Sequence, residues 1–183
     1  MNIGLFFGTF NPIHNGHIYI SKEVLNSKRV DKIWLIVSPQ NLFKKSSIIL
    51  DKNIRMNMVN NAVKKLKNIY SSSVEFELEK PNYTVNTLHF LSANYSANNF
   101  KIIIGEDNLE LFDTWKDSDF IKKNYELIVY PRKKKKISKE LFDGKLIKIS
   151  STDIRKKINN KESIKHLVPK NVEKEILENA YYS

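Results

Sequence analysis

Short apolar runs recur along this chain, and longer stretches with helical spacing separate them. Residues 33–37 are wholly apolar, as expected of a parallel strand that is buried on both faces. Ile54, Met58, Ala62 and Leu66 recur at every fourth position, which is typical of a helix. Strands that alternate with helices predict βαβ units, so the pattern favours a mainly parallel sheet covered by helices.

The expected elements follow from this pattern. Strands are expected at 3–7, 33–37, 74–78, 100–104, 127–130 and 146–149, and helices at 17–25, 51–66, 84–91, 150–158 and 172–177. The prediction is therefore a doubly wound, Rossmann-like α/β fold. Residues 1–183 would form one domain, with a small C-terminal helical subdomain over about 150–183.

Cysteine is absent from the 183 residues. This excludes disulfides, a thiolate nucleophile and cysteine-bound metal centres, and it fits a cytoplasmic protein. No apolar run approaches the roughly 20 residues of a membrane span, and the first residues lack the basic leader of a signal peptide.

The net charge of +11 would suit a polyanion partner, but its composition argues for caution. Only 4 of the 31 basic residues are Arg, the residue best suited to bidentate phosphate recognition. Lys, Ile and Asn, which A/T-rich codons encode, are all frequent. Much of the excess Lys is therefore attributed to genome composition, and the basic tract 132–136 to a solvated loop.

The first expected strand leads into a turn-rich segment with two histidines, Gly8-Thr9-Phe10-Asn11-Pro12-Ile13-His14-Asn15-Gly16-His17. Ligands of open α/β sheets bind at the carboxyl ends of strands, where the start of the next helix attracts phosphate. His14 and His17 are three residues apart and share one face of that helix start. Gly16 would leave room for a ligand between them. Two imidazoles there can donate hydrogen bonds to charge that develops on a leaving phosphate.

A second candidate anion site lies near the other end of the chain, Ile149-Ser150-Ser151-Thr152-Asp153-Ile154-Arg155. Ser and Thr hydroxyls would stand at a helix start, and Arg155 would follow one turn later. Taken alone, such a run of hydroxyls is most simply a helix cap. Paired with the first segment, it indicates a phosphate site built from both ends of the domain.

These two segments resemble the signatures of the nucleotidylyltransferase superfamily, the first being its His-x-Gly-His motif. The middle of the chain is similar to the bacterial nicotinate mononucleotide adenylyltransferases. The resemblance there rests on the Tyr-Thr loop within 81–88, on Gly105 with Asp107, on Trp115-Lys116 and on Tyr130-Pro131-Arg132.

The resemblance implies transfer of the adenylyl group of ATP to nicotinate mononucleotide, which gives nicotinate adenine dinucleotide (deamido-NAD) and pyrophosphate in NAD biosynthesis. A phosphate monoester has a second pKa of about 6, so the attacking phosphate is already anionic at neutral pH. Direct in-line attack then needs neither a general base nor a covalent intermediate. Mg²⁺ is the implied cofactor, bridging the triphosphate through phosphate oxygens and water, because no carboxylate cluster for a protein cage is evident.

The resemblance also assigns residues to roles. Catalysis falls to His14, His17, Lys44 and Arg155. Contacts with ATP fall to those two histidines and Arg155 together with Gly8, Thr9, Phe10, Gly16, Gly105, Asp107, Ser151 and Thr152. Contacts with nicotinate mononucleotide fall to Asn82, Tyr83, Thr84, Trp115 and Arg132. Trp115 could stack on the pyridine ring or belong to the core, and His89 and His166 are expected to be structural or simply exposed.

One segment departs from the family pattern. Phe43 stands where many members have histidine, and Lys44 matches the family lysine. The sequence leaves open whether Lys44 or Lys45 contacts phosphate, how strictly the acid is preferred over the amide, and whether the chain forms a homo-oligomer. Two alternatives also stay open: a pantetheine-phosphate adenylyltransferase or cytidylyltransferase, and a basic nucleic-acid-binding module without catalysis.

Overall fold

The structure, a computed structural model, describes residues 1–40, 49–131 and 142–183. Within these ranges five strands form one parallel sheet in the order β3-β2-β1-β4-β5. The strands are β1 (Asn2–Gly8), β2 (Lys32–Val37), β3 (Ile69–Ser72), β4 (Asn99–Gly105) and β5 (Glu126–Tyr130). The expected doubly wound, Rossmann-like class is therefore confirmed.

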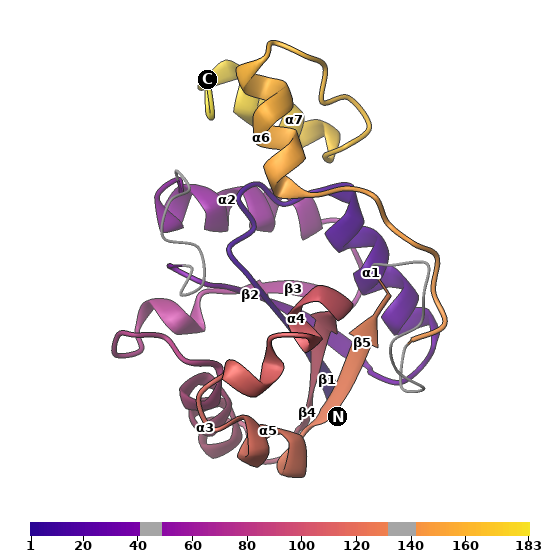
Figure 1. Cartoon of the computed structure of the whole chain (residues 1–183), viewed down its shortest axis with the longest axis vertical. Helices are drawn as coiled ribbons and strands as arrows, with labels where there is room; N and C mark the ends of the chain where they lie inside the picture. The colour runs from indigo at the N-terminus through magenta and orange to yellow at the C-terminus, as the bar shows by residue number, and fades with distance from the viewer. Residues whose placement is uncertain (41–48, 132–141) are drawn as a thin grey trace.

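Helices cover both faces of the sheet (Figure 1). One face carries α1 (Asn15–Asn26) and α2 (Lys52–Val63), with α6 (Ser151–Asn159) and α7 (Lys170–Glu178) packed beyond them. The other carries α3 (Thr84–Asn94), α5 (Ser118–Asn124) and the short α4 (Glu106–Leu109). Each face buries its own apolar cluster, so the central strands are largely apolar, with polar residues mainly toward their amino ends.

Two expected strands are wrong. Residues 74–78 begin with the 3₁₀ helix η1 (Val74–Phe76), and the edge strand β3 lies just before it. Residues 146–149 belong to no strand. Ile147 and Ile149 instead pack against the α1 and α2 side of the core, which accounts for their apolar character. The structure also adds α4, α5 and the 3₁₀ helix η2 (Phe112–Thr114), none of which the periodicity predicts.

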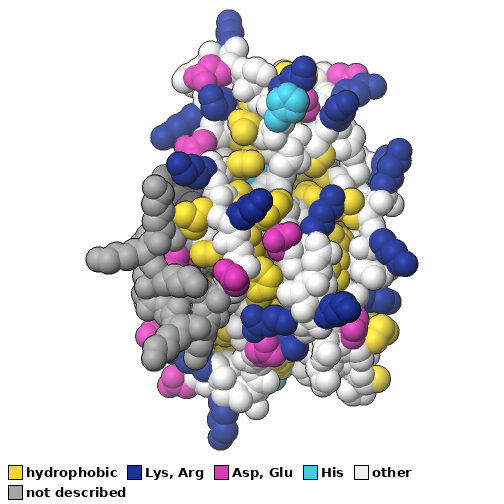
Figure 2. Space-filling view, turned by 90° about the vertical axis from the view of Figure 1, so that its right-hand side faces the viewer, with side chains coloured by type: hydrophobic (Ala, Val, Ile, Leu, Met, Phe, Trp, Pro, Cys, Tyr) yellow, Lys and Arg dark blue, Asp and Glu magenta, His cyan; other side chains and the backbone are white. Residues whose placement is uncertain are grey.

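On the face shown in Figure 2, Lys and Arg side chains are interspersed with acidic and apolar ones and do not form a continuous stripe. In the described part of the chain, no helix has both the length and the apolar character that crossing a bilayer requires.

Candidate active site

The site lies where the strand order reverses. The chain runs outward from β1 through β2 to β3, then crosses back to place β4 on the other side of β1. In parallel sheets the carboxyl ends of the strands flanking such a reversal leave a crevice for ligands. Thr9, Ser38 and Gly105 stand at the carboxyl ends of β1, β2 and β4, so the first histidine segment opens directly onto this crevice.

The two motif histidines stack on each other at the start of α1. Their ring centroids are 3.7 Å apart, and His14 is buried whereas His17 is half-buried. The backbone N–H of His14 donates to Nδ1 of His17 over 3.3 Å. This bond requires a bare Nδ1, so the neutral His17 ring carries its proton on Nε2. His17 thereby has a fixed tautomer whose Nε2–H can donate.

Phe10 holds the His17 ring from the other side. Its φ of 45° lies in the left-handed region, which is strained for a bulky residue. The ring is 2% exposed and meets His17 edge-on at 4.9 Å between centroids. A Cβ on Gly8 would come within 3.2 Å of this ring, so Gly8 makes the close approach possible.

Gly16 allows two parts of the protein to approach it closely. A Cβ on this residue would lie 2.9 Å from Nδ1 of His14 and 3.0 Å from the Cγ2 methyl of Ile147. The room that glycine provides is therefore filled by the His14 ring and by the segment that precedes α6. The contact with ATP assigned to Gly16 stays a prediction.

The second motif docks on the first, as the sequence predicts. Oγ of Ser151 donates to the carbonyl of Pro12 over 2.9 Å, and Arg155 donates to the carbonyl of Asn11 over 2.7 Å. Ser150 caps α6, because its Oγ accepts from the N–H of Asp153. The hydroxyls at the start of α6 and the histidines at the start of α1 thus share one corner of the molecule. That corner combines two helix N-termini with an arginine, which suits a polyphosphate.

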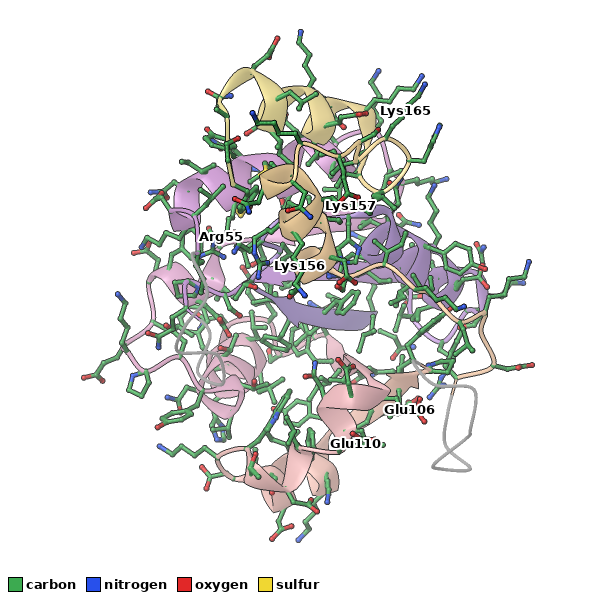
Figure 3. All side chains as sticks on the ribbon, turned by 45° about the horizontal axis from the view of Figure 1, so that its top comes forward. Arg55, Glu106, Glu110, Lys156, Lys157 and Lys165 are labelled. Atoms are coloured by element: carbon green, nitrogen blue, oxygen red, sulfur yellow. The ribbon has the colours of Figure 1, made fainter. Side chains whose placement is uncertain are left out.

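Arg55 stabilises the loops next to this corner through hydrogen bonds to their backbone carbonyls. The sequence analysis did not identify it. Its guanidinium is fully buried, on the α2 side of the sheet (Figure 3). It donates to the carbonyls of Thr9, Ser38, Pro39 and Leu50 over 2.6 to 2.9 Å. Burial lowers the pKa of this guanidinium from its usual value. Arg55 therefore ties the loops that follow β1 and β2 to α2.

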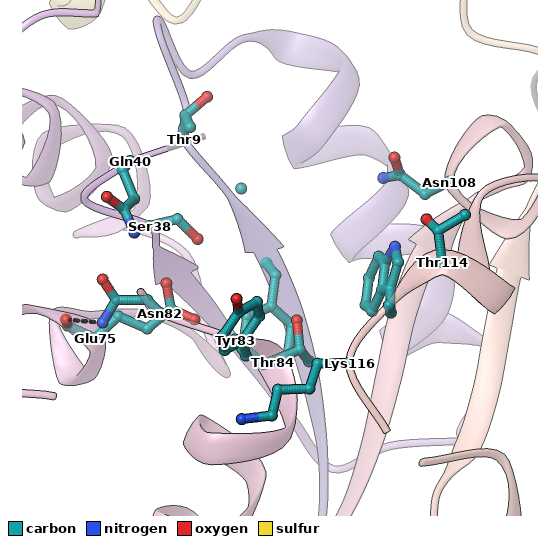
Figure 4. Close-up of a pocket in the computed structure, with 13 residues that line it drawn as sticks. Thr9, Ser38, Gln40, Glu75, Asn82, Tyr83, Thr84, Asn108, Thr114 and Lys116 are labelled. Carbon is teal, nitrogen blue, oxygen red and sulfur yellow. Dashed lines mark hydrogen bonds between the residues drawn. The ribbon is translucent and has the colours of Figure 1, made fainter. Parts of the chain in front are cut away.

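A cleft of about 400 Å³ opens beside this corner (Figure 4). Its walls include Thr9, Ser38, Tyr83, Thr84, Trp115 and Lys116. Tyr83 is the N-cap of α3 and Thr84 its first residue. The first turn of a helix leaves backbone N–H groups without intrahelical partners, which suits an anion.

Trp115 faces the cleft from η2. Its ring packs against Phe112 at 4.9 Å between centroids, and it is only half-buried. The two expectations for Trp115, core packing and ring stacking, are therefore compatible. Lys116 extends over the ring of Tyr83 at 4.9 Å, which links the η2 segment to the start of α3.

Glu75 and Asn82 form a further part of the cleft wall that the sequence reasoning did not recognise as a pair. Both are buried, at 2% and 7% exposure. Nδ2 of Asn82 donates to the carbonyl of Glu75 over 2.8 Å, and Thr87 donates to Oε1 of Glu75 over 3.0 Å. Oε2 of Glu75 and Oδ1 of Asn82 have no hydrogen-bond partner within the described residues. Burial raises the pKa of the Glu75 carboxyl, and the hydroxyls of Ser38 and Thr87 oppose the shift.

The remaining expected residues lie in different places. Asp107 is exposed just beyond β4, next to the buried Glu106. His89 and His166 are exposed, as expected. The sequence assignments of Lys44, Lys45, Phe43 and Arg132 fall outside the described residues and stay predictions.

Comparisons with known proteins agree with this geometry. The family profile described as cytidylyltransferase-like matches residues 5–157. The chain is 43% identical over 190 residues to a protein of Cytophaga hutchinsonii named probable nicotinate-nucleotide adenylyltransferase, covering 100% of this chain and 99% of that one. A protein of the same name from Christiangramia forsetii is 41% identical, over 98% of this chain and 97% of that protein. The solved structure of Plasmodium falciparum nicotinic acid mononucleotide adenylyltransferase complexed with NaAD superposes with a TM-score of 0.82 at 20% identity, covering 99% of this chain and 97% of that one.

Proposed function

Because this chain belongs to the cytidylyltransferase-like superfamily and, within it, to the nicotinate-nucleotide adenylyltransferases, we propose that its cleft aligns ATP and nicotinate mononucleotide for direct adenylyl transfer. The activity that follows from this membership is nicotinate-nucleotide adenylyltransferase activity in NAD biosynthesis. The observation that carries the proposed mechanism is the docking of Ser151 and Arg155 on the loop that holds His14 and His17.

In this proposal the mononucleotide phosphate attacks the α-phosphorus of ATP, the bond from that phosphorus to the β-phosphate oxygen breaks, and pyrophosphate leaves. The described residues supply alignment and charge, which is most of what phosphoryl transfer requires. His17 donates from Nε2 to the triphosphate, and His14 supports its ring. Arg155, Ser151, Thr152 and the Thr9 and Phe10 backbone neutralise the developing charge.

The other expected contacts complete the proposal. Gly105 and Asp107, at the end of β4, would face adenosine. Tyr83 and Thr84 would receive the nicotinate carboxylate at the start of α3, and Trp115 would cover the pyridine ring. Lys44 and Arg132 retain their proposed roles toward phosphate and the mononucleotide.

Magnesium enters this proposal with ATP. No group of three or more metal-ligating side chains that could hold a metal ion occurs among residues 1–40, 49–131 and 142–183. We therefore propose that phosphate oxygens and water coordinate Mg²⁺, and that the chain contributes no cage of its own. A cytoplasmic location also stays a proposal.

A direct assay tests the function. The purified protein is incubated with ATP, Mg²⁺ and nicotinate mononucleotide, and both pyrophosphate and the dinucleotide are measured. Parallel reactions replace nicotinate mononucleotide by phosphopantetheine, or ATP by CTP. Dinucleotide formation with ATP is expected to dominate, and a larger rate in either parallel reaction would instead support one of the other superfamily activities.

A further inference from the structure

Two residues of the cleft wall each have a buried side-chain oxygen atom without a hydrogen-bond partner among the described residues. Each belongs to a side chain whose other polar atom is already fixed: Thr87 holds Oε1 of Glu75, and the Glu75 carbonyl holds Nδ2 of Asn82. The two remaining atoms, Oε2 and Oδ1, are unpartnered within the described residues, and both side chains line the cleft (Figure 4). Leaving a buried acceptor unsatisfied costs about 1–3 kcal/mol, so this wall is incomplete until donors arrive.

The chemistry of the substrate limits which donors can arrive. In nicotinate mononucleotide the carboxylate and the phosphate are acceptors, and the pyridine ring has no N–H group. The two ribose hydroxyls are its only strong donors. The two hydroxyls therefore match in number and in kind the two acceptors of the wall.

The position of the wall selects one of the two riboses in the reaction. Glu75 and Asn82 line the same cleft as Tyr83, Thr84 and Trp115, where the nicotinate group is proposed to bind. Of the residues proposed for ATP, Gly8 and Thr9 line the end of the cleft nearest the phosphate corner, whereas Gly105, Asp107, Ser151 and Thr152 do not line it. The ribose that meets Glu75 is therefore the one attached to the pyridine ring.

We infer that the Glu75 carboxylate and the Asn82 side-chain oxygen accept hydrogen bonds from the ribose hydroxyls of the mononucleotide, an inference that rests on the proposed function and extends it. Binding then completes the polar wall, and the ribose is held between the phosphate corner and the pyridine end. The site selects ribonucleotides over deoxynucleotides on the mononucleotide side.

The test combines altered substrates with an altered wall. Wild-type protein is assayed with nicotinate mononucleotide and with its 2′-deoxy and 3′-deoxy analogues. At least one analogue is expected to lose about 10- to 100-fold in kcat/KM, the scale of one hydrogen bond to a charged group. Glu75→Gln presents an amide N–H₂ in place of Oε2, so we expect a similar loss with the ribonucleotide.

The decisive result is non-additivity. If Glu75 contacts the missing hydroxyl, Glu75→Gln and the deoxy substrate remove the same interaction, and their combined loss is close to either loss alone. Glu77→Gln is the matched control, because Glu77 is exposed two residues away, and it should behave as wild type. Discrimination between ATP and its deoxy analogues should be equal in all three proteins.

Several outcomes would overturn the inference. Equal kcat/KM of the wild type for all three mononucleotides would do so, and so would fully additive losses in Glu75→Gln. A change of acid-to-amide preference in Glu75→Gln with ribose discrimination intact would assign Glu75 to the pyridine substituent instead. If the wild type releases no pyrophosphate, the proposed function fails, and calorimetric affinities for the ribo- and deoxymononucleotides still decide the ribose contact. The same wild-type affinities decide it if Glu75→Gln does not fold.

Discussion

The cleft joins two regions that differ in how completely their buried polar groups are hydrogen-bonded within the described protein. The phosphate corner (His14, His17, Ser151, Thr152, Arg155) is tied to backbone carbonyls at Asn11 and Pro12, and Arg55 ties down the adjoining loops at Thr9 and Ser38. The mononucleotide wall (Glu75, Asn82, Tyr83, Thr84) has two buried oxygens that the described protein leaves unpartnered.

This difference matches the kinds of ligand that the two regions are proposed to receive. A polyphosphate is recognised by charge and by a rigid array of donors, so preorganisation there lowers the barrier to reaction. A nucleoside carries specific hydroxyls and a ring substituent, and acceptors waiting for them give selectivity. We therefore expect the corner to govern rate and stability, and the wall to govern substrate choice.

The largest expected effect concerns Arg55, which ties the loops that follow β1 and β2 to α2. Arg55→Met should lower the free energy of unfolding by about 3–5 kcal/mol, because four backbone carbonyls lose their donors at roughly 1 kcal/mol each. Urea denaturation measures it. Arg29→Met is the control: Arg29 pairs with Glu126 at the surface, and its loss should cost less than about 1 kcal/mol. Equal losses of unfolding free energy in Arg55→Met and Arg29→Met would contradict this stabilising role of Arg55.

The next effect concerns catalysis at the corner. His17→Ala removes the proposed Nε2–H donor, and kcat should fall by roughly 10²-fold or more while KM for ATP changes far less. Steady-state pyrophosphate release measures both. His166→Ala, at an exposed position, should stay near wild type. A kcat for His17→Ala close to that of the wild type would remove His17 from the mechanism.

A smaller effect separates the wall from the corner. The N–H of Tyr83 donates to the carbonyl of Pro81 over 2.9 Å, so the start of α3 from Thr84 onward is the part that favours a carboxylate. Nicotinate mononucleotide should therefore exceed its amide analogue by on the order of tenfold to a thousandfold in kcat/KM. Trp115→Ala should weaken both substrates and keep their ratio, because the ring covers either one equally. Equal rates for acid and amide would contradict the placement of the carboxylate at α3.

The smallest effect is a pH dependence of stability. The pKa of Glu75 is raised in the folded protein by burial, so the folded state holds its proton more tightly than the unfolded state does. Stability from this group is present below the unfolded value of about 4.5 and is lost as pH rises toward the folded value.

Glu75→Gln should therefore gain stability relative to the wild type as pH increases from 4 upward, by at most about 1.4 kcal/mol per pH unit. Denaturation of both proteins at several pH values measures this difference. Glu77→Gln, at an exposed position, should show no such trend relative to the wild type. A constant difference between Glu75→Gln and the wild type would mean that the Glu75 carboxyl is not perturbed.

The sequence predicts the parts of the fold where one physical cause dominates. Strands β1, β2, β4 and β5 follow from apolar runs, since central parallel strands are buried on both faces. The alternation of apolar and polar residues at 74–78 led to a wrong strand prediction for an identifiable reason. It suggests that the two glutamates face solvent, but η1 turns Glu75 inward while Glu77 stays exposed. A carboxyl that is buried in the wall of a polar cleft breaks the pattern on which strand prediction depends.

The sequence predicts the site residues that belong to recognisable motifs. It does not predict those whose role depends on tertiary packing. The docking of residues 150–155 on residues 8–17 follows the prediction. Arg55 looks like any polar residue of a helix, yet a usable signal existed: in a chain where Lys supplies nearly all positive charge, each of the four Arg residues stands out. Among the described ones, Arg55 and Arg155 each bind carbonyls of the motif loops.

The corner also determines when during synthesis the protein becomes active. Its ties join residues 139 and 144 positions apart, and the hydroxyl of Tyr182 donates to Oδ1 of Asn11 across 171 positions. A chain emerging from the ribosome therefore presents its histidines long before anything can hold their loop. Contacts of such high order are also slow to form. The proposed adenylyl transfer should thus begin only after the segment from Ser151 to Tyr182 has left the exit tunnel.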